Sequence, residues 1–200
     1  MITPFVILCD SGEQKPWSFD GIALDSADAK KSKTEFYQPR LKRAFIGQSQ
    51  GDYCIEEDHG LCHIERKSVE DCVSTVLDWE HKERWENTLE FLDSIDSAAV
   101  VVEGTLQQCI AAVKGCDSPD LIQKALRLKQ LNGTPIEKTV KYKKPEVDRR
   151  KSFFREVISE QQRFPNVCWM FADDRRLAEV FTFRWMVRYF MKARDMKKLS

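Results

Sequence analysis

Three short apolar runs, far apart in the chain, constrain the fold more than any other feature. They occupy Phe5–Cys9, Ala98–Val102 and Val167–Phe171, and polar or turn-forming residues follow each within two positions. Runs of this length without alternating polar residues are typical of strands buried on both faces of a sheet. Segments with helical periodicity lie between them, and 200 residues suit one domain. The pattern predicts one α/β or α+β domain in three layers.

Caps, turn residues and periodicity place the remaining elements. A strand is predicted over residues 34–41, and alternating segments at 52–57 and 61–67 predict a β-hairpin. Ser68 is expected to cap the helix that follows the hairpin. The predicted helices span residues 69–95, 105–113, 118–133, 148–164 and 175–194.

The hairpin concentrates charge on two short strands. Alternate residues of a strand share a face, so Glu65 and Lys67 are expected to point together while Arg66 points to the other side. Asp52 starts the partner strand, where the register could bring its carboxylate beside that of Glu65. Neighbouring carboxylates repel and favour a bound cation, and Mg²⁺ takes oxygen ligands. These residues are candidates for metal-assisted phosphodiester hydrolysis, in which Lys67 orients water or neutralises charge on the phosphate.

Asp10 ends the first predicted strand, where α/β sheets tend to place ligand sites. Together with Glu13 it could widen the acidic cluster of the hairpin. The competing interpretation is a side chain that only caps the end of its strand. The sequence leaves both roles of Asp10 open.

Charge is divided unevenly along the chain, although the net charge is zero. Residues 1–122 hold 12 basic and 23 acidic residues, a net charge of −11, whereas residues 123–200 hold 20 and 9, a net charge of +11. The two parts could form complementary packed faces, or an acidic metal site beside a surface that binds a polyanion. A basic stripe on the last helix, which fits either a solvated face or a DNA contact, consists of Arg184, Arg188 and Lys192.

Seven cysteines are present, and no two of them form a CxxC pair. Free cysteines inside apolar runs fit a reducing compartment, so a cytoplasmic location is expected, which is compatible with nucleoid association or a phage origin. The chain holds no apolar run of about 18 residues. Its first residues lack a basic region and a cleavage site. Neither a membrane-spanning helix nor a signal peptide is expected.

A longer string of residues around the hairpin narrows the function. Residues 51–53 read Gly-Asp-Tyr, and residues 65–71 read Glu-Arg-Lys-Ser-Val-Glu-Asp. This G-D-Y…E-R-K-x-x-x-D pattern resembles the nuclease domain of the XPF family of structure-specific endonucleases, a branch of the PD-(D/E)xK superfamily. Residues 6–19, 65–106 and 164–186 also resemble segments of that domain, so the resemblance covers most of the chain.

The resemblance implies a restriction-endonuclease-like α/β domain, with a central mixed sheet flanked by helices. It also implies Mg²⁺- or Mn²⁺-dependent endonuclease activity on DNA near branches or junctions between single and double strands, as in repair, recombination or phage DNA processing. Asp52 and Glu65 would be metal ligands with Asp10 beside them, and Lys67 would position the water. The residues carried over as supporting the site are Asp10, Glu13, Arg66 and Asp71. Glu103 is expected to be structural.

Two departures from the family are visible. Gly12 stands where the family usually has an arginine, so a charge near the scissile phosphate is missing, and Lys15 is a candidate substitute. No glycine follows Gly133, so a helix-hairpin-helix module with its glycine-rich hairpins is not expected. The chain is expected to be a single nuclease domain with insertions near residues 25–33 and 134–150.

DNA would then have to be held by other parts of the protein. The basic segment 141–151, which ends in Arg149, Arg150 and Lys151, is a candidate DNA clamp or a solvated linker. Aromatic residues that could belong to the core or to a dimer face are Phe181, Trp185 and Tyr189. A homodimer or a protein partner is compatible with the sequence, and a membrane partner is not expected.

Two other functions remain open. A catalytically weak or inactive relative that binds branched DNA or scaffolds a partner would fit Gly12, although the retained E-R-K string argues against it. A domain whose hairpin charges are only ion-paired, Lys67 with Glu65 and Arg66 with Asp71, would explain part of the clustering. Metal affinity separates the last function from the other two, and DNA cleavage separates the nuclease from its inactive relative.

Overall fold

One mixed sheet of six strands forms the centre of the molecule. The computed structural model describes residues 2–23, 36–57, 61–78, 80–113 and 149–199. The strands are β1 (Ile2–Asp10), β2 (Gln38–Ala44), β3 (Tyr53–Ile55), β4 (Cys62–Lys67), β5 (Ser97–Val102) and β6 (Val167–Phe171). They follow the order β2-β1-β3-β4-β5-β6. β3 runs antiparallel to both of its neighbours, and the other adjacent strands are parallel.

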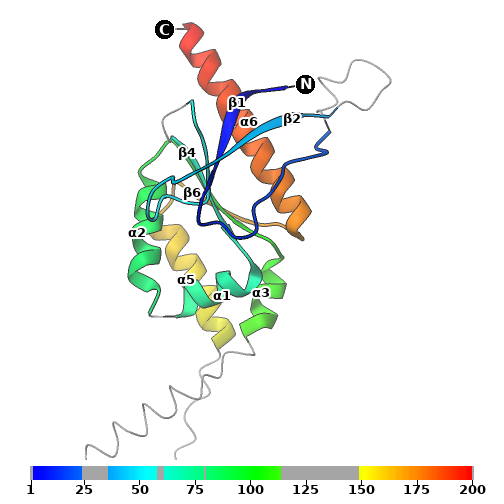
Figure 1. The fold of residues 1–200 in the computed structure, drawn as a ribbon. Helices are drawn as coiled ribbons and strands as arrows, with labels where there is room; N and C mark the ends of the chain where they lie inside the picture. Colours follow the sequence, from blue (N-terminus) through cyan, green and yellow to red (C-terminus); the bar gives the residue numbers. More distant parts are fainter. Residues whose placement is uncertain (1, 24–35, 58–60, 79, 114–148, 200) are drawn as a thin grey trace, which may run out of the picture.

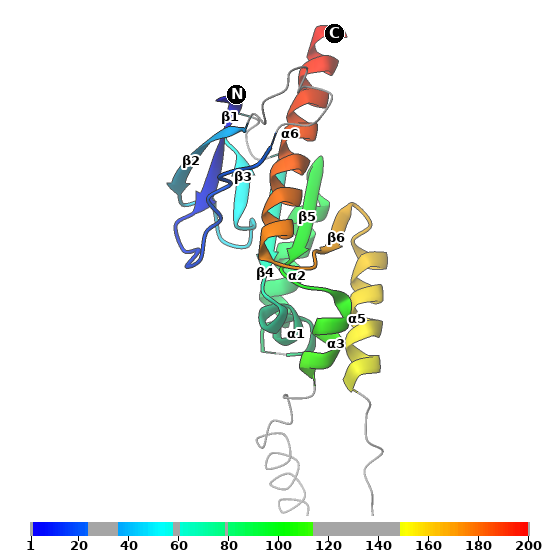
Figure 2. The ribbon, with the colours of Figure 1, turned by 90° about the vertical axis from the view of Figure 1, so that its right-hand side faces the viewer.

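Helices cover both faces of this sheet, which gives three layers (Figures 1 and 2). The described helices are α1 (Val69–Leu77), α2 (Lys82–Asp93), α3 (Leu106–Ala112), α5 (Arg149–Arg163) and α6 (Arg175–Leu199). Side chains of α6 pack in the core on one face, and side chains of α1, α2, α3 and α5 pack in the core on the other. The arrangement confirms the α/β three-layer prediction.

The middle of β5 shows how the two cores are built. Val101 packs beneath α6, in the core that holds Phe183. Its neighbour Val100 packs on the opposite face, in the core that holds Leu89 and Phe153. Because consecutive strand residues point to opposite faces, a strand covered on both sides requires an unbroken apolar run. This is the reason why such runs predicted the layers correctly.

β2 lies at the edge of the sheet and starts later than the sequence predicts. Its Pro39 is tolerated at an edge, because proline has no N–H to give to a neighbouring strand. The strand begins at Gln38, whereas the prediction began at residue 34. The Tyr37 N–H instead donates to the Ile22 carbonyl at 2.9 Å, so the chain just before β2 pairs with a different segment.

The helix predicted over residues 69–95 is wrong, because two helices occupy this region. Ser68 caps the start of α1 as predicted, because its Oγ accepts the Asp71 N–H at 3.1 Å. The helix ends at Asp78, whose backbone is extended (φ −93°, ψ 116°) and whose side chain accepts the Glu80 N–H at 3.1 Å. An aspartate that bonds the backbone locally competes with a helix. This break gives α2 its own direction.

The remaining elements agree with their predictions where the structure describes them. Strands β1, β5 and β6 and helices α3, α5 and α6 are present, and Thr105 caps α3 through a complete capping box. The predicted helix 118–133 and most of both expected insertions lie outside the described residues. The six cysteines in the described part of the chain are free. No helix in that part is long and apolar enough to cross a lipid bilayer.

Candidate active site

Asp52 and Glu65 face each other across the β3–β4 hairpin. Asp52 directly precedes Tyr53, which pairs with Ile64, and Glu65 directly follows Ile64. Residues opposite each other on antiparallel strands have Cβ atoms about 5 Å apart. The Asp52 N–H donates to the Ile64 carbonyl at 2.8 Å, and Asp52 Oδ2 accepts the Arg66 N–H at 2.7 Å. The register is therefore the one that brings the two carboxyl groups together.

Gly51 explains why a glycine precedes the aspartate in the G-D-Y string. Its φ is +84°, a conformation that L-residues with a side chain rarely adopt. A Cβ at this position would also lie 3.0 Å from the carbonyl oxygen of Ile64. The backbone of the neighbouring strand cannot yield to a side chain there. The glycine thus lets the chain enter β3 with Asp52 against the hairpin.

Lys67 extends from the same face of β4 as Glu65. Its Nζ lies 2.8 Å from Glu65 Oε1 and 4.9 Å from the centre of the Trp85 ring, and the side chain is only 16% exposed. Burial alone would lower the pKa of Lys67, but the carboxylates of Glu65, Asp52 and Asp71 together outweigh burial, so this pKa is raised. Lys67 is therefore a firmly held cation between a carboxylate and an aromatic face.

The surroundings of Asp52 disfavour the ionised form of its carboxyl group. Burial raises its pKa well above the usual value, and the negative charge of Glu65 raises it further. The Arg66 N–H and the Lys67 charge act in the opposite direction and compensate only in part. A bound cation would stabilise both carboxylates in their ionised form, and carboxylate oxygens are the donors that Mg²⁺ or Mn²⁺ takes. The residues present therefore fit the metal that the family resemblance implies.

Asp10 ends β1 as predicted, but its carboxylate already has two partners. Oδ1 accepts the Ile46 N–H at 3.1 Å, and Oδ2 accepts the Gly12 N–H at 2.7 Å. These bonds make Asp10 the cap of its turn, which was the competing interpretation. In the part of the chain that the structure describes, no three His, Cys, Asp or Glu side chains are grouped to hold a metal ion. Asp52 and Glu65 therefore form a pair that no third such side chain joins among the described residues.

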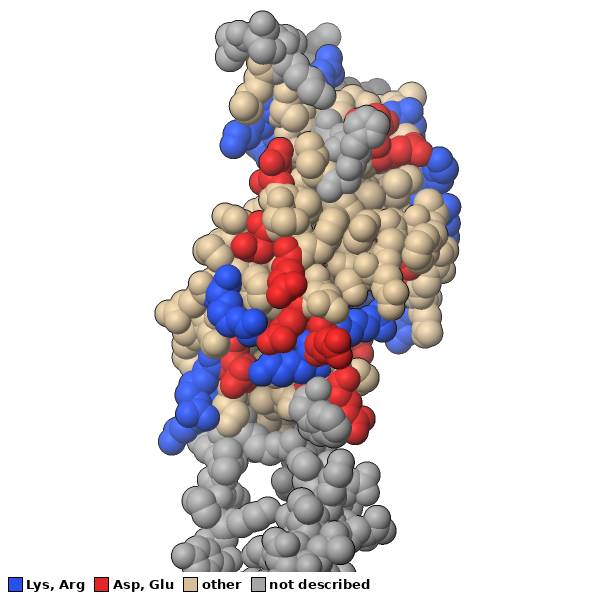
Figure 3. Space-filling view, turned by 90° about the vertical axis from the view of Figure 1, so that its left-hand side faces the viewer, with Lys and Arg blue, Asp and Glu red and all other residues tan. Residues whose placement is uncertain are grey.

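An open pocket of about 460 Å³ lies between the hairpin, the segment after β2 and helices α1 and α2. It brings together the predicted site residues Asp10, Asp52, Glu65, Lys67 and Asp71. α2 lies on the side of the molecule shown in Figure 3, where acidic side chains form a band with basic side chains beside it. Four carboxylates, those of Asp10, Asp52, Glu65 and Asp71, line the pocket itself.

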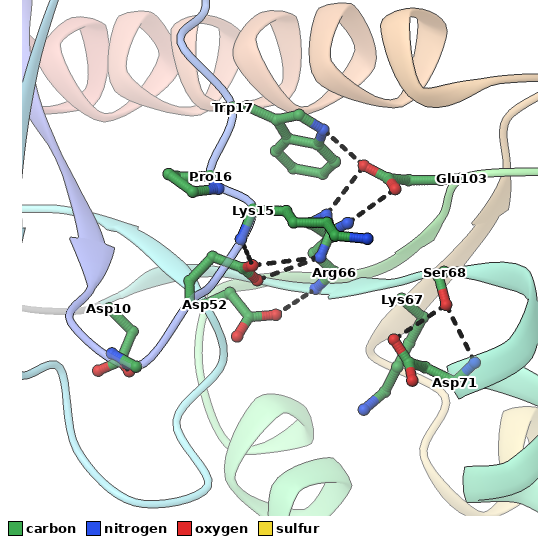
Figure 4. A network of polar contacts seen from close by, with 12 residues as sticks. Asp10, Lys15, Pro16, Trp17, Asp52, Arg66, Lys67, Ser68, Asp71 and Glu103 are labelled. Carbon is green, nitrogen blue, oxygen red and sulfur yellow. Dashed lines mark hydrogen bonds and ion pairs between the residues drawn. The ribbon is translucent and has the colours of Figure 1, made fainter.

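Arg66 points to the opposite face of β4 and anchors a separate network (Figure 4). Its Nε and Nη2 donate to the two carboxylate oxygens of Glu103, both at 2.8 Å, and its Nη1 lies 3.2 Å from Glu13 Oε2. Trp17 Nε1 donates to Glu103 Oε1 at 2.8 Å. The three charged side chains are only 8–9% exposed. Glu103 is structural, as predicted.

Glu13 pairs with Arg66, with Oε2 3.2 Å from Nη1, and its negative charge also raises the pKa of Asp52, so it lies beside the acidic cluster of the hairpin. One competing interpretation of these charges does not hold. Arg66 does not pair with Asp71, because Asp71 Oδ2 instead accepts the Ser68 hydroxyl at 2.9 Å (Figure 4). Neither partner is apparent from the sequence, since both pairings depend on how segments cross the sheet.

Two residues that the sequence did not identify support Lys67. Trp85 is 4% exposed, and its Nε1 donates to Glu160 Oε1 at 3.0 Å. The other carboxyl oxygen of Glu160 is buried without a partner in the described part of the chain, and burial raises the pKa of Glu160 to about 7. Glu160 thus orients the indole that Lys67 contacts. Helical spacing in the sequence predicts only that Trp85 is buried. Nothing near Glu160 in the sequence indicates that it contacts Trp85, which lies 75 positions away.

The predicted DNA-binding residues that the structure describes are exposed but do not line the pocket. Lys15 is exposed on the loop after β1, and Arg150 and Lys151 are exposed in the first turn of α5. None of these three lines the pocket as the described residues form it. The side chain of Arg149 and most of the basic segment before it lie outside the described residues, so the prediction of a DNA clamp stays a prediction.

Comparison with known proteins supports the assignment of the fold. No protein-family model matches the sequence, and a search of the curated proteins finds no significant match. Among solved structures, the chain is similar to XPF from Aeropyrum pernix, with a TM-score of 0.52 and 14% sequence identity. The alignment covers 96% of this chain and 69% of that one. The chain has an XPF-like fold. This confirms the restriction-endonuclease-like arrangement of a mixed sheet flanked by helices.

Proposed function

We propose that the protein is a metal-dependent DNA endonuclease that hydrolyses phosphodiester bonds in branched or junction DNA. The observation that carries this proposal is the placement of Asp52, Glu65 and Lys67 together on one face of a hairpin, in the wall of an open pocket. The XPF-like fold supports it, because this is the fold that the motif resemblance implied.

Asp52 and Glu65 would hold Mg²⁺ or Mn²⁺ with water completing the coordination, because both carboxylate oxygens of Asp10 already accept backbone N–H groups. One or two carboxylates plus water form a usual environment for Mg²⁺. Such a cation, when bound, polarises a phosphodiester and makes water more acidic. Because burial and the charge of Glu65 raise the pKa of Asp52, a bound cation would favour the ionised form of this carboxyl group.

Lys67 supplies the positive charge that belongs to the chain itself. Its raised pKa keeps it protonated at neutral pH, so its ammonium group can donate to a phosphate oxygen or orient water. The contacts with Glu65 and Trp85 hold the long side chain in place before substrate arrives. A preorganised donor adds more to the rate than a mobile one, because less freedom is lost in the reaction.

The alternative function, a catalytically weak family member that binds branched DNA, rests on Gly12, because the chain lacks the family arginine at this position. A Cβ at this position would lie 2.9 Å from Asp10 Oδ2, so a side chain here would displace the Asp10 carboxylate. The turn is not without positive charge, since Arg43 from β2 donates to the carbonyls of Ser11 and Glu13 at 2.8 and 2.7 Å. Arg43 is thus a second candidate, beside Lys15, for the charge that the family arginine supplies.

Cleavage of labelled flap, fork, duplex and single-stranded DNA with Mg²⁺ or Mn²⁺ tests the proposal. Wild type is expected to cut a branched substrate, and Asp52→Ala and Lys67→Ala are each expected to lower the rate by about 10²-fold or more. Lys42→Ala is the matched control, because Lys42 is exposed and paired with Glu56 at the sheet edge. Cutting that survives both site variants would place the activity elsewhere. Tight binding of forks by a wild type that cuts nothing would support the weak family member.

A further inference from the structure

A second hollow lies along α6, and the proposed chemistry does not use it. Its volume is about 740 Å³, within the range of roughly 300–1,000 Å³ typical of ligand sites. Asp96 and Ser97, at the start of β5, contribute to its wall, and the rest comes from residues 181–196 of α6. The C-terminal turns of α6 extend past the end of the sheet (Figures 1 and 2). We call this hollow the α6 groove.

Cations and aromatic rings alternate along the α6 groove. The residues that line it in this alternating order are Phe181, Arg184, Trp185, Arg188, Tyr189 and Lys192. Each kind recurs every four residues, so the two kinds form adjacent stripes on one side of the helix. The sequence left the basic stripe as a solvated face or a DNA contact, and the aromatic stripe as core or a dimer face. The structure shows that both stripes line the same hollow.

The ring at the centre of the groove is held in place. Trp185 Nε1 donates to Ser97 Oγ at 2.8 Å, and the Trp185 ring lies 5.5 Å from the Phe181 ring. Arg184 is also fixed, because its Nη2 donates to the Ala23 carbonyl at 3.2 Å. Rigid aromatic faces lose little entropy when a flat ligand stacks on them. The groove is therefore prepared for a ligand that carries both flat rings and negative charge.

A single strand of nucleic acid has these two properties in the same alternating order. Proteins that hold single strands combine a positively charged groove for the phosphates with aromatic side chains on which bases stack. A second copy of the chain suits the groove less well, because a two-fold contact centred there would set Arg188 and Lys192 near their own copies. Such like-charge contacts are unfavourable. Among the described residues that line the groove, three are cations and one, Asp96, is acidic, so charge favours a polyanion.

We propose that the α6 groove binds single-stranded nucleic acid, and, if the proposed function holds, that this is the unpaired arm of a branched DNA substrate. The groove lies at the opposite end of the sheet from the pocket. Ser97 pairs with Cys62, whereas Lys67 pairs with Val102, and five strand steps of about 3.3 Å separate the two levels by about 17 Å. The two sites also lie on opposite faces. The groove would therefore hold an arm of the substrate away from the bond that is cut.

Binding of a fluorescein-labelled oligothymidylate, followed by anisotropy without divalent metal, tests this proposal. The assay uses the full chain carrying Asp52→Ala, so that no cleavage interferes. Adding Arg188→Glu and Lys192→Glu is expected to weaken binding at least tenfold, and Tyr189→Ala to weaken it about tenfold by removing one stacking face. The two charge variants lie at exposed positions, so folding should be preserved. Arg194→Glu, on the same helix but outside the groove lining, is the matched control and should bind as the parent does.

The salt dependence of binding adds a second measurement. Each phosphate contact that is lost should reduce the slope of log affinity against log salt by about 0.7. Equal losses in Arg194→Glu and the groove variants would overturn the proposal, because the effect would then be general charge. Equal competition by polyglutamate would also overturn it, in favour of an acidic protein partner. A dimer in sedimentation that the groove variants dissociate would assign the groove to a second copy.

These results are independent of the nuclease proposal. Loss of oligothymidylate binding in the groove variants, together with a wild type that cuts no DNA, would support the groove and refute the proposed function. Cleavage that depends on Asp52, together with unchanged oligothymidylate binding in the groove variants, would support the function and refute the groove.

Discussion

Arg66 illustrates how a residue inside the G-D-Y…E-R-K string can have a structural partner far away in the sequence. Its guanidinium and the Glu103 carboxylate are both nearly buried, so removing one charge leaves the other without full compensation. Glu103→Ala is expected to lower the free energy of unfolding by about 3 kcal/mol. Glu86→Ala breaks the much more exposed pair with Arg163 and is expected to cost about 0–1 kcal/mol. Urea unfolding of both variants checks this, and equal costs would show that Glu103 is not a structural anchor.

Glu160 is expected to make stability depend on pH. Burial raises its pKa from an ordinary value of 4.5 to about 7, so between these values the folded protein keeps a proton that the unfolded chain releases. The free energy of unfolding therefore falls as pH rises through this window, by about 3 kcal/mol. Glu160→Gln removes this fall and keeps an oxygen for the Trp85 N–H.

Urea unfolding at pH 5 and pH 8 measures the effect of Glu160. The gain in stability of Glu160→Gln over wild type should be larger at pH 8 than at pH 5. Glu83→Gln, at an exposed position in the first turn of α2, is the matched control for loss of a negative charge, because Glu83 is not among the charges that shift the pKa of Glu160. A pH-independent difference between Glu160→Gln and wild type would contradict the raised pKa.

At the level of elements, the start of α1 links the fold to the pocket. Ser68 Oγ accepts the Asp71 N–H and donates to Asp71 Oδ2, so one hydroxyl caps the helix and holds a residue of the pocket wall. Ser68→Ala is expected to cost about 1 kcal/mol of stability and to lower kcat/KM several-fold. Thr105→Ala removes a comparable cap from α3 and is expected to cost a similar stability but no activity. Thermal unfolding and cleavage rates of both variants distinguish the two roles, and equal activities would show that Asp71 does not depend on Ser68.

For the whole molecule, metal binding is expected to couple to stability. A ligand that binds only the folded state at 100 times its Kd adds about 2.7 kcal/mol, which corresponds to about 5–10 °C in Tm for a chain of this size. Mn²⁺ is therefore expected to raise the Tm of wild type and of Lys42→Ala, and EDTA to reverse the rise. Asp52→Ala should lose the rise. An undiminished rise in Asp52→Ala would mean that the cation binds outside the hairpin.

The acidic and the basic part of the sequence contribute to hollows at opposite ends of the sheet. The acidic part of the sequence supplies the predicted site residues that line the pocket, at the end of β4. The basic part supplies α6 and the cations of the α6 groove, at the start of β5. In the proposed function these are the two roles that a nuclease needs, a cation site for chemistry and a polyanion site for substrate.

The local character of the motifs explains why the sequence predicted the hairpin well. Alternation along β4 places Glu65 and Lys67 on one face, and the hairpin register places Asp52 across from Glu65. Gly51 is required because a Cβ there would approach the carbonyl oxygen of Ile64 on the neighbouring strand. Apolar runs predicted the buried strands, because a strand covered on both faces has few other choices. Each of these inferences depends on residues within one or two elements.

Only the tertiary structure decided which distant residues complete the site. Arg66 pairs with Glu103, 37 positions away, and Trp85 receives its acceptor from Glu160, 75 positions away. The end of α1 at Asp78 was likewise not predicted, because no glycine or proline stands there. Periodicity and caps specify which face a side chain occupies within its own element. The partner that it meets depends on how elements cross the sheet, and that is settled by the packing of both cores together.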